Sequence, residues 1–116
     1  MSLKRPLFIL AVVLLITLST GCTSLAIGDV SYYNRGLSVH VSNSGDPFDG
    51  GIQVRIYEIK NLNQQELTVT GIPVSVKKGE NEFTVPVPLE PGTYKIYVYL
   101  TADGERMTAS IRDIVV

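Results

Sequence analysis

One stretch near the C-terminal end of this 116-residue sequence restricts the fold more than any other. From Tyr94 to Thr101 the side chains alternate between two classes, and the dipeptide Asp103-Gly104 follows. Alternation with a period of two is typical of a half-buried β-strand, and Asp-Gly favours the type I′ turn of a hairpin. With this turn, the inward face would pair Leu100 with Met107, Val98 with Ala109 and Ile96 with Ile111. Burial and turn geometry thus predict the same register.

The remaining sequence after residue 28 also consists of short alternating runs between turn signals. The expected strands are residues 29–33, 37–42, 52–57, 67–76 (one or two short strands), 83–87, 94–101 and a last one after Gly104. Residues 61–65 are polar and predict a loop, and Pro86 and Pro88 place residues 83–87 at a sheet edge. About seven strands in one domain predict an all-β fold, an immunoglobulin-like β-sandwich. The lack of Trp and of a Cys pair excludes the antibody type.

The first 21 residues have the layout of a secretory signal peptide. Lys4 and Arg5 precede residues 7–18, which are all apolar except Thr17. As a helix, that stretch would be about 18 Å long, which is shorter than the roughly 30 Å core of a bilayer. The sequence Ser19-Thr20-Gly21-Cys22 that follows resembles the lipobox, the processing site of prokaryotic lipoproteins.

This resemblance implies that the Cys22 thiol receives a diacylglycerol, that acyl groups such as palmitate anchor the chain, and that cleavage leaves Cys22 as the N-terminus. We therefore expect a signal peptide at residues 1–21, a tether at 22–28 and the sandwich at 29–116. An uncleaved N-terminal transmembrane helix is the alternative anchor. Either form places the domain at a cell membrane or outer membrane, facing the periplasm or the outside.

The sandwich region also resembles CARDB-type and related fibronectin III-like domains of prokaryotic cell surfaces. The resemblance is carried by the Val-x-Val-x-Asn-x-Gly element at residues 39–45, the Lys78-Gly79-Glu80 turn and the Pro91-Gly92-Thr93-Tyr94 start of a long strand. It implies a structural role for these elements, with the Tyr94 hydroxyl capping a loop as a corner tyrosine. It also implies a surface or adhesive setting without indicating a substrate.

Composition limits the chemistry available to the chain. Lys and Arg number 10 against 11 Asp and Glu, so no basic surplus indicates nucleic acid as a partner. A single His and a single Cys rule out a site built from several His or Cys ligands. Asn43, Asp46 and Asp49 share a loop, but their spacing matches no known calcium loop. We expect His40 to be an ordinary exposed or cross-strand residue, and we expect no catalytic residues, metal or cofactor.

Tyrosine and arginine side chains form the most informative candidate site. Tyr57, Tyr97 and Tyr99 fall on the outward phase of their strands, and Arg55, Arg106 and Arg112 are expected on the same phase. Tyr and Arg are enriched where proteins bind partners. The alternative is ordinary cross-strand packing of half-buried rings on a sheet surface.

These observations predict a non-enzymatic, membrane-anchored lipoprotein with a binding or structural domain at the cell envelope. Its expected partners are membrane lipid through Cys22 and an envelope protein or glycan. One alternative is a carbohydrate- or small-molecule-binding module that uses the Tyr and Arg face. Another is an inhibitor or chaperone that presents a loop or a strand edge.

Overall fold

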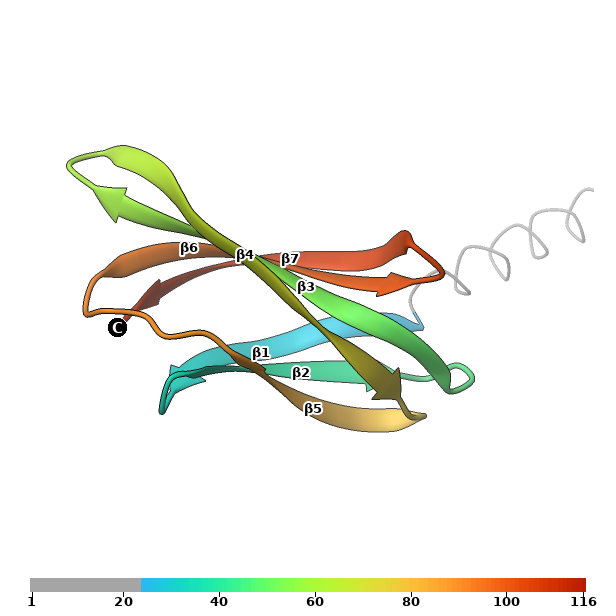
Figure 1. Cartoon of the computed structure of the whole chain (residues 1–116). Helices are drawn as coiled ribbons and strands as arrows, with labels where there is room; N and C mark the ends of the chain where they lie inside the picture. The colour runs from blue at the N-terminus through green and yellow to red at the C-terminus, as the bar shows by residue number, and fades with distance from the viewer. Residues whose placement is uncertain (1–23) are drawn as a thin grey trace, which may run out of the picture.

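The computed structural model describes residues 24–116, which contain seven strands and no helix (Figure 1). In chain order the strands are β1 Leu25–Tyr33, β2 Gly36–Asn43, β3 Phe48–Lys60, β4 Asn63–Val76, β5 Gly79–Pro86, β6 Thr93–Ala102 and β7 Glu105–Val115. The predicted all-β, immunoglobulin-like sandwich is confirmed. The expected N-terminal signal or anchor helix and Cys22 lie outside the described residues.

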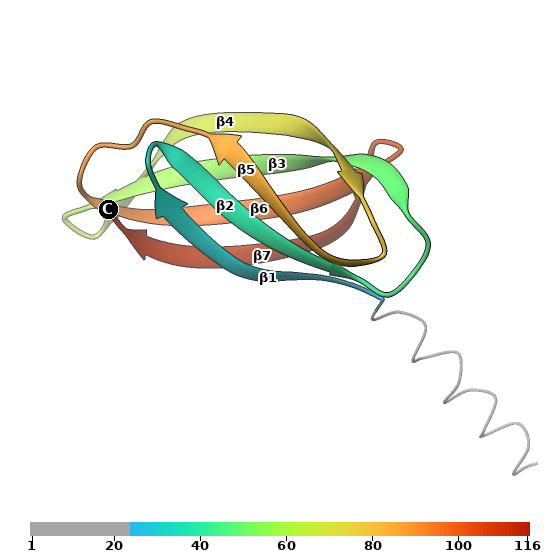
Figure 2. The same ribbon diagram turned by 90° about the horizontal axis from the view of Figure 1, so that it is seen from below.

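The strands form two antiparallel sheets that pack face to face. One sheet has the order β1-β2-β5 and the other the order β4-β3-β6-β7. Figure 2 shows the three-stranded sheet in front of the four-stranded one, with the strands of the two layers crossing obliquely. The sheet edges are therefore β1 and β5 in one layer and β4 and β7 in the other. As the two prolines predict, β5 is an edge strand.

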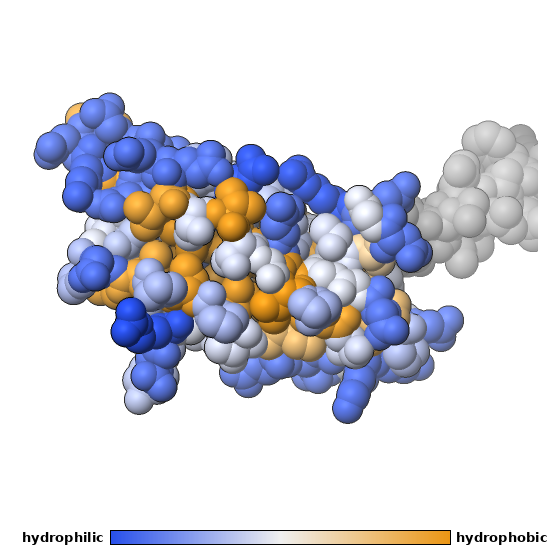
Figure 3. Space-filling view, viewed as in Figure 1, coloured by the Kyte–Doolittle hydropathy of each residue, from blue (hydrophilic) through white to orange (hydrophobic). Residues whose placement is uncertain are grey.

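The core lies between the sheets and is built from the inward phase of each strand. Its fully or nearly fully buried members are Leu37, Val39, Val41, Ile52, Val54, Ile56, Val74, Val76, Val85, Val87, Tyr94, Ile96, Val98 and Leu100. β4 and β5, the edges of the two layers, face the viewer in Figure 3, where apolar side chains form a band between polar margins. Apolar side chains are thus visible from outside between β4 and β5.

Type I′-like turns close three of the hairpins. Asp103 and Gly104 have φ of 52° and 76°, and they form the turn that the sequence predicts. Positive φ values at Asn34-Arg35 and Asn61-Leu62 close two further hairpins. Because the Asn61-Leu62 turn is so tight, the expected loop at residues 61–65 is wrong, and β4 is one continuous strand that starts at Asn63.

The turn places Ala102 opposite Glu105 and Thr101 opposite Arg106, as its geometry predicts, but the predicted pairs of Leu100, Val98 and Ile96 are wrong. A β-bulge at Met107 shifts β7 by one residue, so Leu100 pairs with Thr108 and Tyr97 pairs with Ile111. A one-residue shift turns every following side chain to the opposite face. Met107 and Ile111, expected in the core, are therefore each 54% exposed.

The physical reason for this shift lies on the inner side of β7, which packs against the edge strand β1. The inner phase of β7 is only half-buried there and includes Ser110 and Arg112. The Arg112 guanidinium donates to the Ser110 hydroxyl and, at 3.1 Å, to the carbonyl oxygen of Gly28 in β1. Arg112 thus lies opposite to the outward face expected for it, and it ties the two sheets together along this side.

β1 begins at Leu25, four residues earlier than expected, so residues 25–28 belong to the sheet and not to a tether. β3 also begins early, at Phe48, because residues 48–50 pair with the end of β4. Gly50 lets the backbone of β6 approach closely. A Cβ atom at Gly50 would lie 2.1 Å from the carbonyl oxygen of Thr101, so any larger residue would force the two strands apart.

Two tyrosines fix the connection between β5 and β6. The Tyr94 hydroxyl donates to the carbonyl oxygen of Glu90 at 2.6 Å, and its ring is only 2% exposed. The expected corner tyrosine is therefore present. The Tyr32 hydroxyl donates to the carbonyl oxygen of Val87 at 2.9 Å and accepts from the Leu89 amide at 2.8 Å. This second anchor has no signal in the sequence, because Tyr32 lies 55 residues before Val87.

Candidate functional site

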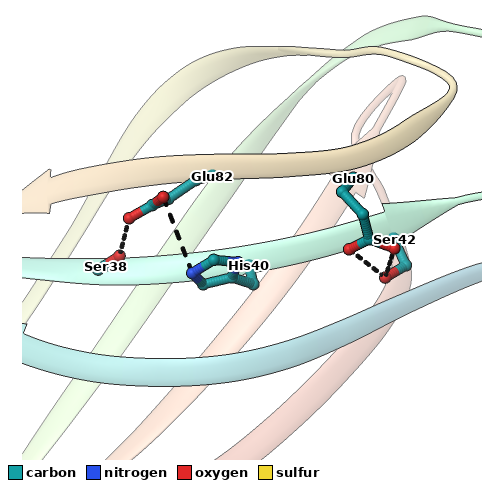
Figure 4. Close-up of polar contacts among 5 residues, drawn as sticks. All are labelled: Ser38, His40, Ser42, Glu80 and Glu82. Atoms are coloured by element: carbon teal, nitrogen blue, oxygen red, sulfur yellow. Dashed lines mark hydrogen bonds and ion pairs between the residues drawn. The ribbon is translucent and has the colours of Figure 1, made fainter.

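The outer face of the β1-β2-β5 sheet carries a row of polar cross-strand contacts (Figure 4). The Ser38 hydroxyl donates to Glu82 Oε1 at 2.8 Å, and His40 Nε2 lies 3.8 Å from Glu82 Oε2. Further along the same strands, the Ser42 hydroxyl is 2.9 Å from both carboxylate oxygens of Glu80. His40 is thus a half-exposed cross-strand residue, as expected.

The order of these groups differs from that of a nucleophile and its base. In a Ser–His–acid triad the imidazole lies between the hydroxyl and the carboxylate, so that it can take the hydroxyl proton. Here Glu82 lies between Ser38 and His40, and the Ser38 proton is already directed at the carboxylate. The contacts are those of polar pairs that stabilise neighbouring strands.

The loop with the clustered oxygen atoms has structural partners instead. Asn43 Oδ1 accepts from the Gly45 amide at 3.0 Å, and its Nδ2 donates to the Asp46 carbonyl at 3.1 Å. Asp49 accepts from the Ser75 hydroxyl at 2.8 Å. Within residues 24–116, no group of three His, Cys, Asp or Glu side chains could hold a metal ion.

The outer face of the β4-β3-β6-β7 sheet brings the predicted tyrosines and two of the arginines together. We call Tyr57, Tyr97, Tyr99, Arg55 and Arg106 the tyrosine face. Arg55 on β3 pairs with Tyr97 on β6, and the next outward pairs along these strands are Tyr57 with Lys95 and Gln53 with Tyr99. Because directly paired residues of an antiparallel sheet share one face, these side chains project on the same side of the sheet.

The rings of the tyrosine face contact one another. Tyr57 meets Tyr97 edge to face, with centroids 5.4 Å apart and planes at 71°. Tyr97 and Tyr99 are nearly parallel, at 17° and 6.5 Å. The Arg106 guanidinium carbon lies 4.0 Å from the centroid of the Tyr99 ring, which is cation–π geometry. The result is a continuous ladder of three rings and one cation across β3, β6 and the start of β7.

Neither arginine of this face has a carboxylate partner in the described part of the chain. The ion pairs there are His40–Glu82, Lys60–Glu58 and Lys95–Asp113. Arg55 Nε is buried and has no hydrogen-bond acceptor. Two guanidinium groups of this face therefore have no carboxylate within ion-pair distance in the described chain.

The sequence did not reveal the apolar residues that flank this face. In the row centred on Arg55 and Tyr97, Val69 of β4 lies at one end and Ile111 of β7 at the other. Both side chains are exposed. Ile111 is outside only because of the bulge at Met107, and a strict alternation rule cannot detect a bulge. The bulge also replaces Ser110 by Ile111 as the partner of Tyr97, so this face is more apolar than expected.

The predicted lipid-attachment residue, Cys22, lies outside the described residues. In the part of the chain that the structure covers, no helix is long and apolar enough to cross a membrane.

Comparisons with known proteins find no related family. No protein-family model matches this sequence, and no curated protein is similar to it. A putative beta-galactosidase from Bacteroides fragilis has a similar structure over 82% of this chain, at 17% identity and a TM-score of 0.48. Spo0M, a sporulation control protein from Bacillus subtilis, matches over 78% of this chain at 14% identity and a TM-score of 0.35. The chain spans 16% of the first protein and 46% of the second. Neither likeness bears on the function of this chain.

Proposed function

We propose that this protein is a lipoprotein, anchored through Cys22, whose sandwich domain binds a partner at the cell envelope and catalyses no reaction. The tyrosine face carries the binding part of this proposal. Interface hot spots are rich in Tyr and Arg that lie among apolar neighbours. Val69 and Ile111 supply such neighbours at the two ends of the central row.

The unbalanced charges of the tyrosine face indicate the chemistry of the partner. Arg55 and Arg106 have no carboxylate within ion-pair distance in the described chain, so a partner with acidic groups would complement both. The rings contact one another, and the Arg106 guanidinium covers one face of Tyr99. Because the two arginines call for anionic groups, a protein with exposed acidic side chains fits better than a neutral sugar.

A carbohydrate is the second candidate partner. The half-exposed rings of Tyr97 and Tyr99 favour it, because flat aromatic rings can stack on sugar units. An acidic glycan would also satisfy the two arginines. The two candidates differ in a simple measurement, since added soluble acidic glycans would quench tyrosine fluorescence saturably only if the partner is a carbohydrate.

The sequence supports the membrane anchor. Residues 7–18 are apolar except for Thr17, and Cys22 follows the small residues Ser19, Thr20 and Gly21. The intact mass of the protein from the membrane fraction tests this part. We expect a chain that begins at an acylated Cys22, and we expect Cys22→Ser to leave the domain folded but lose membrane retention. An unmodified Cys22 in an uncleaved chain would refute acylation and indicate the transmembrane alternative.

A matched pair of substitutions tests the binding face. Tyr97→Ser removes the central ring, whereas Tyr33→Ser makes the same chemical change at an 84% exposed tyrosine of the other sheet. We expect the labelled wild-type domain to bind saturably to envelopes from cells that lack the protein. Tyr97→Ser should reduce this binding at least tenfold, and Tyr33→Ser should leave it unchanged. Equal binding by both folded variants would contradict the assignment of the tyrosine face.

A further inference from the structure

The N-terminal entry of the chain into the sandwich is fixed to one end of the domain. The carbonyl oxygen of Ser24, the first described residue, accepts hydrogen bonds from the Ser44 amide at 2.8 Å and the Ser44 hydroxyl at 3.2 Å. β1 begins at the next residue, Leu25. The chain therefore has no free linker between Ser24 and the sheet.

The sequence leaves only a short distance between this end and the proposed anchor. Cys22 precedes Ser24 by two positions, and two residues span at most about 7 Å. We infer that the end of the sandwich next to Ser24 rests on the phospholipid headgroups, with the strands directed away from the bilayer. This inference rests on the proposed attachment at or before Cys22.

The surface of this end suits a headgroup. A groove of about 390 Å³ lies beside Ser24, and it is also lined by the side chains of Ser42, Ser44, Lys78 and Glu80. The Lys78 ammonium group is a donor for a lipid phosphate, and the Glu80 carboxylate, which also accepts from the Ser42 hydroxyl, is an acceptor for the ammonium group of an ethanolamine. Lys77 on the same turn is also exposed. A groove with both charges complements a zwitterionic headgroup at the membrane surface.

The opposite end of the domain then lies far from the membrane. β3 runs from Phe48, near the anchored end, to Lys60, and this length corresponds to about 40 Å at the usual rise per residue. The β3–β4 hairpin, with the fully exposed Leu62 at its tip, projects from that far end (Figure 1). The tyrosine face would stand upright and remain open to a partner along its length.

Fluorescent labels at three exposed positions test this orientation. In the full, acylated protein an introduced cysteine is the only free thiol, so Asp46→Cys, Glu66→Cys and Leu62→Cys each accept one label. Asp46 lies in the β2–β3 loop at the anchored end, Glu66 on the outer face of β4 and Leu62 at the far tip. The vesicles contain phosphatidylethanolamine and phosphatidylglycerol, with a fraction of lipids that carry a quencher on the headgroup.

We expect strong quenching at Asp46 and little at Glu66 or Leu62. Quenching at Glu66 as strong as at Asp46 would mean that the domain lies on its tyrosine face, and it would overturn the inference. Absence of quenching at all three positions would show that the domain is held away from the bilayer, which also overturns it. Acylation is read separately from the intact mass of the same samples. If the intact mass shows an uncleaved chain, Cys22 keeps a free thiol, so the labels are read in a Cys22→Ser background. The inference then applies to the transmembrane alternative, which is joined to the domain through the same residue, Ser24.

Discussion

Removal of a single oxygen atom from Tyr94 tests whether the corner tyrosine stabilises the sandwich as the geometry indicates. Tyr94→Phe keeps the buried ring, so the apolar area removed from water hardly changes. The substitution removes the hydrogen bond to the Glu90 carbonyl oxygen, which is 2.6 Å long and partly buried. Loss of such a bond, with the acceptor left unpaired, costs about 1 to 2 kcal/mol.

This cost is a large fraction of the stability of a small domain, which is on the order of 5 kcal/mol. The melting temperature should therefore fall by roughly 5 to 10 °C. Urea unfolding followed by circular dichroism gives the free energy of unfolding directly. The denaturant slope should stay constant, because the same surface is exposed on unfolding.

Tyr33→Phe is the matched control, since Tyr33 is exposed and lies on the other sheet. We expect this control to change the free energy of unfolding by less than about 0.5 kcal/mol, the usual range for a surface substitution. If Tyr94→Phe proves as neutral as Tyr33→Phe, the hydroxyl does not hold the β5–β6 connection, and the assignment of a corner tyrosine is refuted.

Four further predictions concern the stability of the fold. Val98→Asp should unfold the domain, as read by circular dichroism, because an unpaired carboxylate in a fully buried position costs several kcal/mol. A folded Val98→Asp variant would contradict the assigned core. Tyr97→Ser should lower the free energy of unfolding by about 1 kcal/mol or less. A chain of residues 29–116 should be less stable in urea than one of residues 24–116, by about 2 kcal/mol, because it loses the pairs of residues 25–27 with β2 and the half-buried side chains of Leu25 and Ile27. Equal stability would show that this part of β1 contributes nothing. Burial raises the pKa of Tyr94 in the folded state. The stability that comes from the protonated Tyr94 hydroxyl is therefore fully present below a pH of about 10 and is lost as the pH rises through the raised pKa. If the wild type and Tyr94→Phe lose stability equally above a pH of about 10, Tyr94 is not the cause of the loss.

Much of the sandwich could be predicted from the sequence because the central strands are buried on one face only. β6 shows this best: Ile96, Val98 and Leu100 point inward and the tyrosines between them point outward, as their alternation predicts. The Asp103-Gly104 turn was also predictable, since both positions adopt positive φ. The same alternation placed Tyr57, Tyr97 and Tyr99 on one outer face.

The edges of the sheets could not be predicted by the same rule. β7 packs its inner side against β1 and not against the centre of the core, so half-buried Ser110 and Arg112 are tolerated there. A bulge at Met107 then turns Ile111 outward. The turn at Asn61-Leu62 has no glycine and therefore gave no hairpin signal. The register of β3 and β4 also shifts by one residue between Ile56 and Tyr57. The row of Val69, Arg55, Tyr97 and Ile111 depends on this shift and on the bulge at Met107, which is why the sequence predicts only its two central members.

The proposed binding face is tested most directly by photo-crosslinking in the cells that make the protein. A photoreactive phenylalanine analogue replaces Tyr97 in one variant and the exposed Tyr33 in a matched variant. We expect a discrete crosslinked product from position 97, with a partner rich in acidic groups, and none from position 33. Equal products from both positions, or none from position 97 in a folded, membrane-bound protein, would contradict the proposal that this domain acts through its tyrosine face.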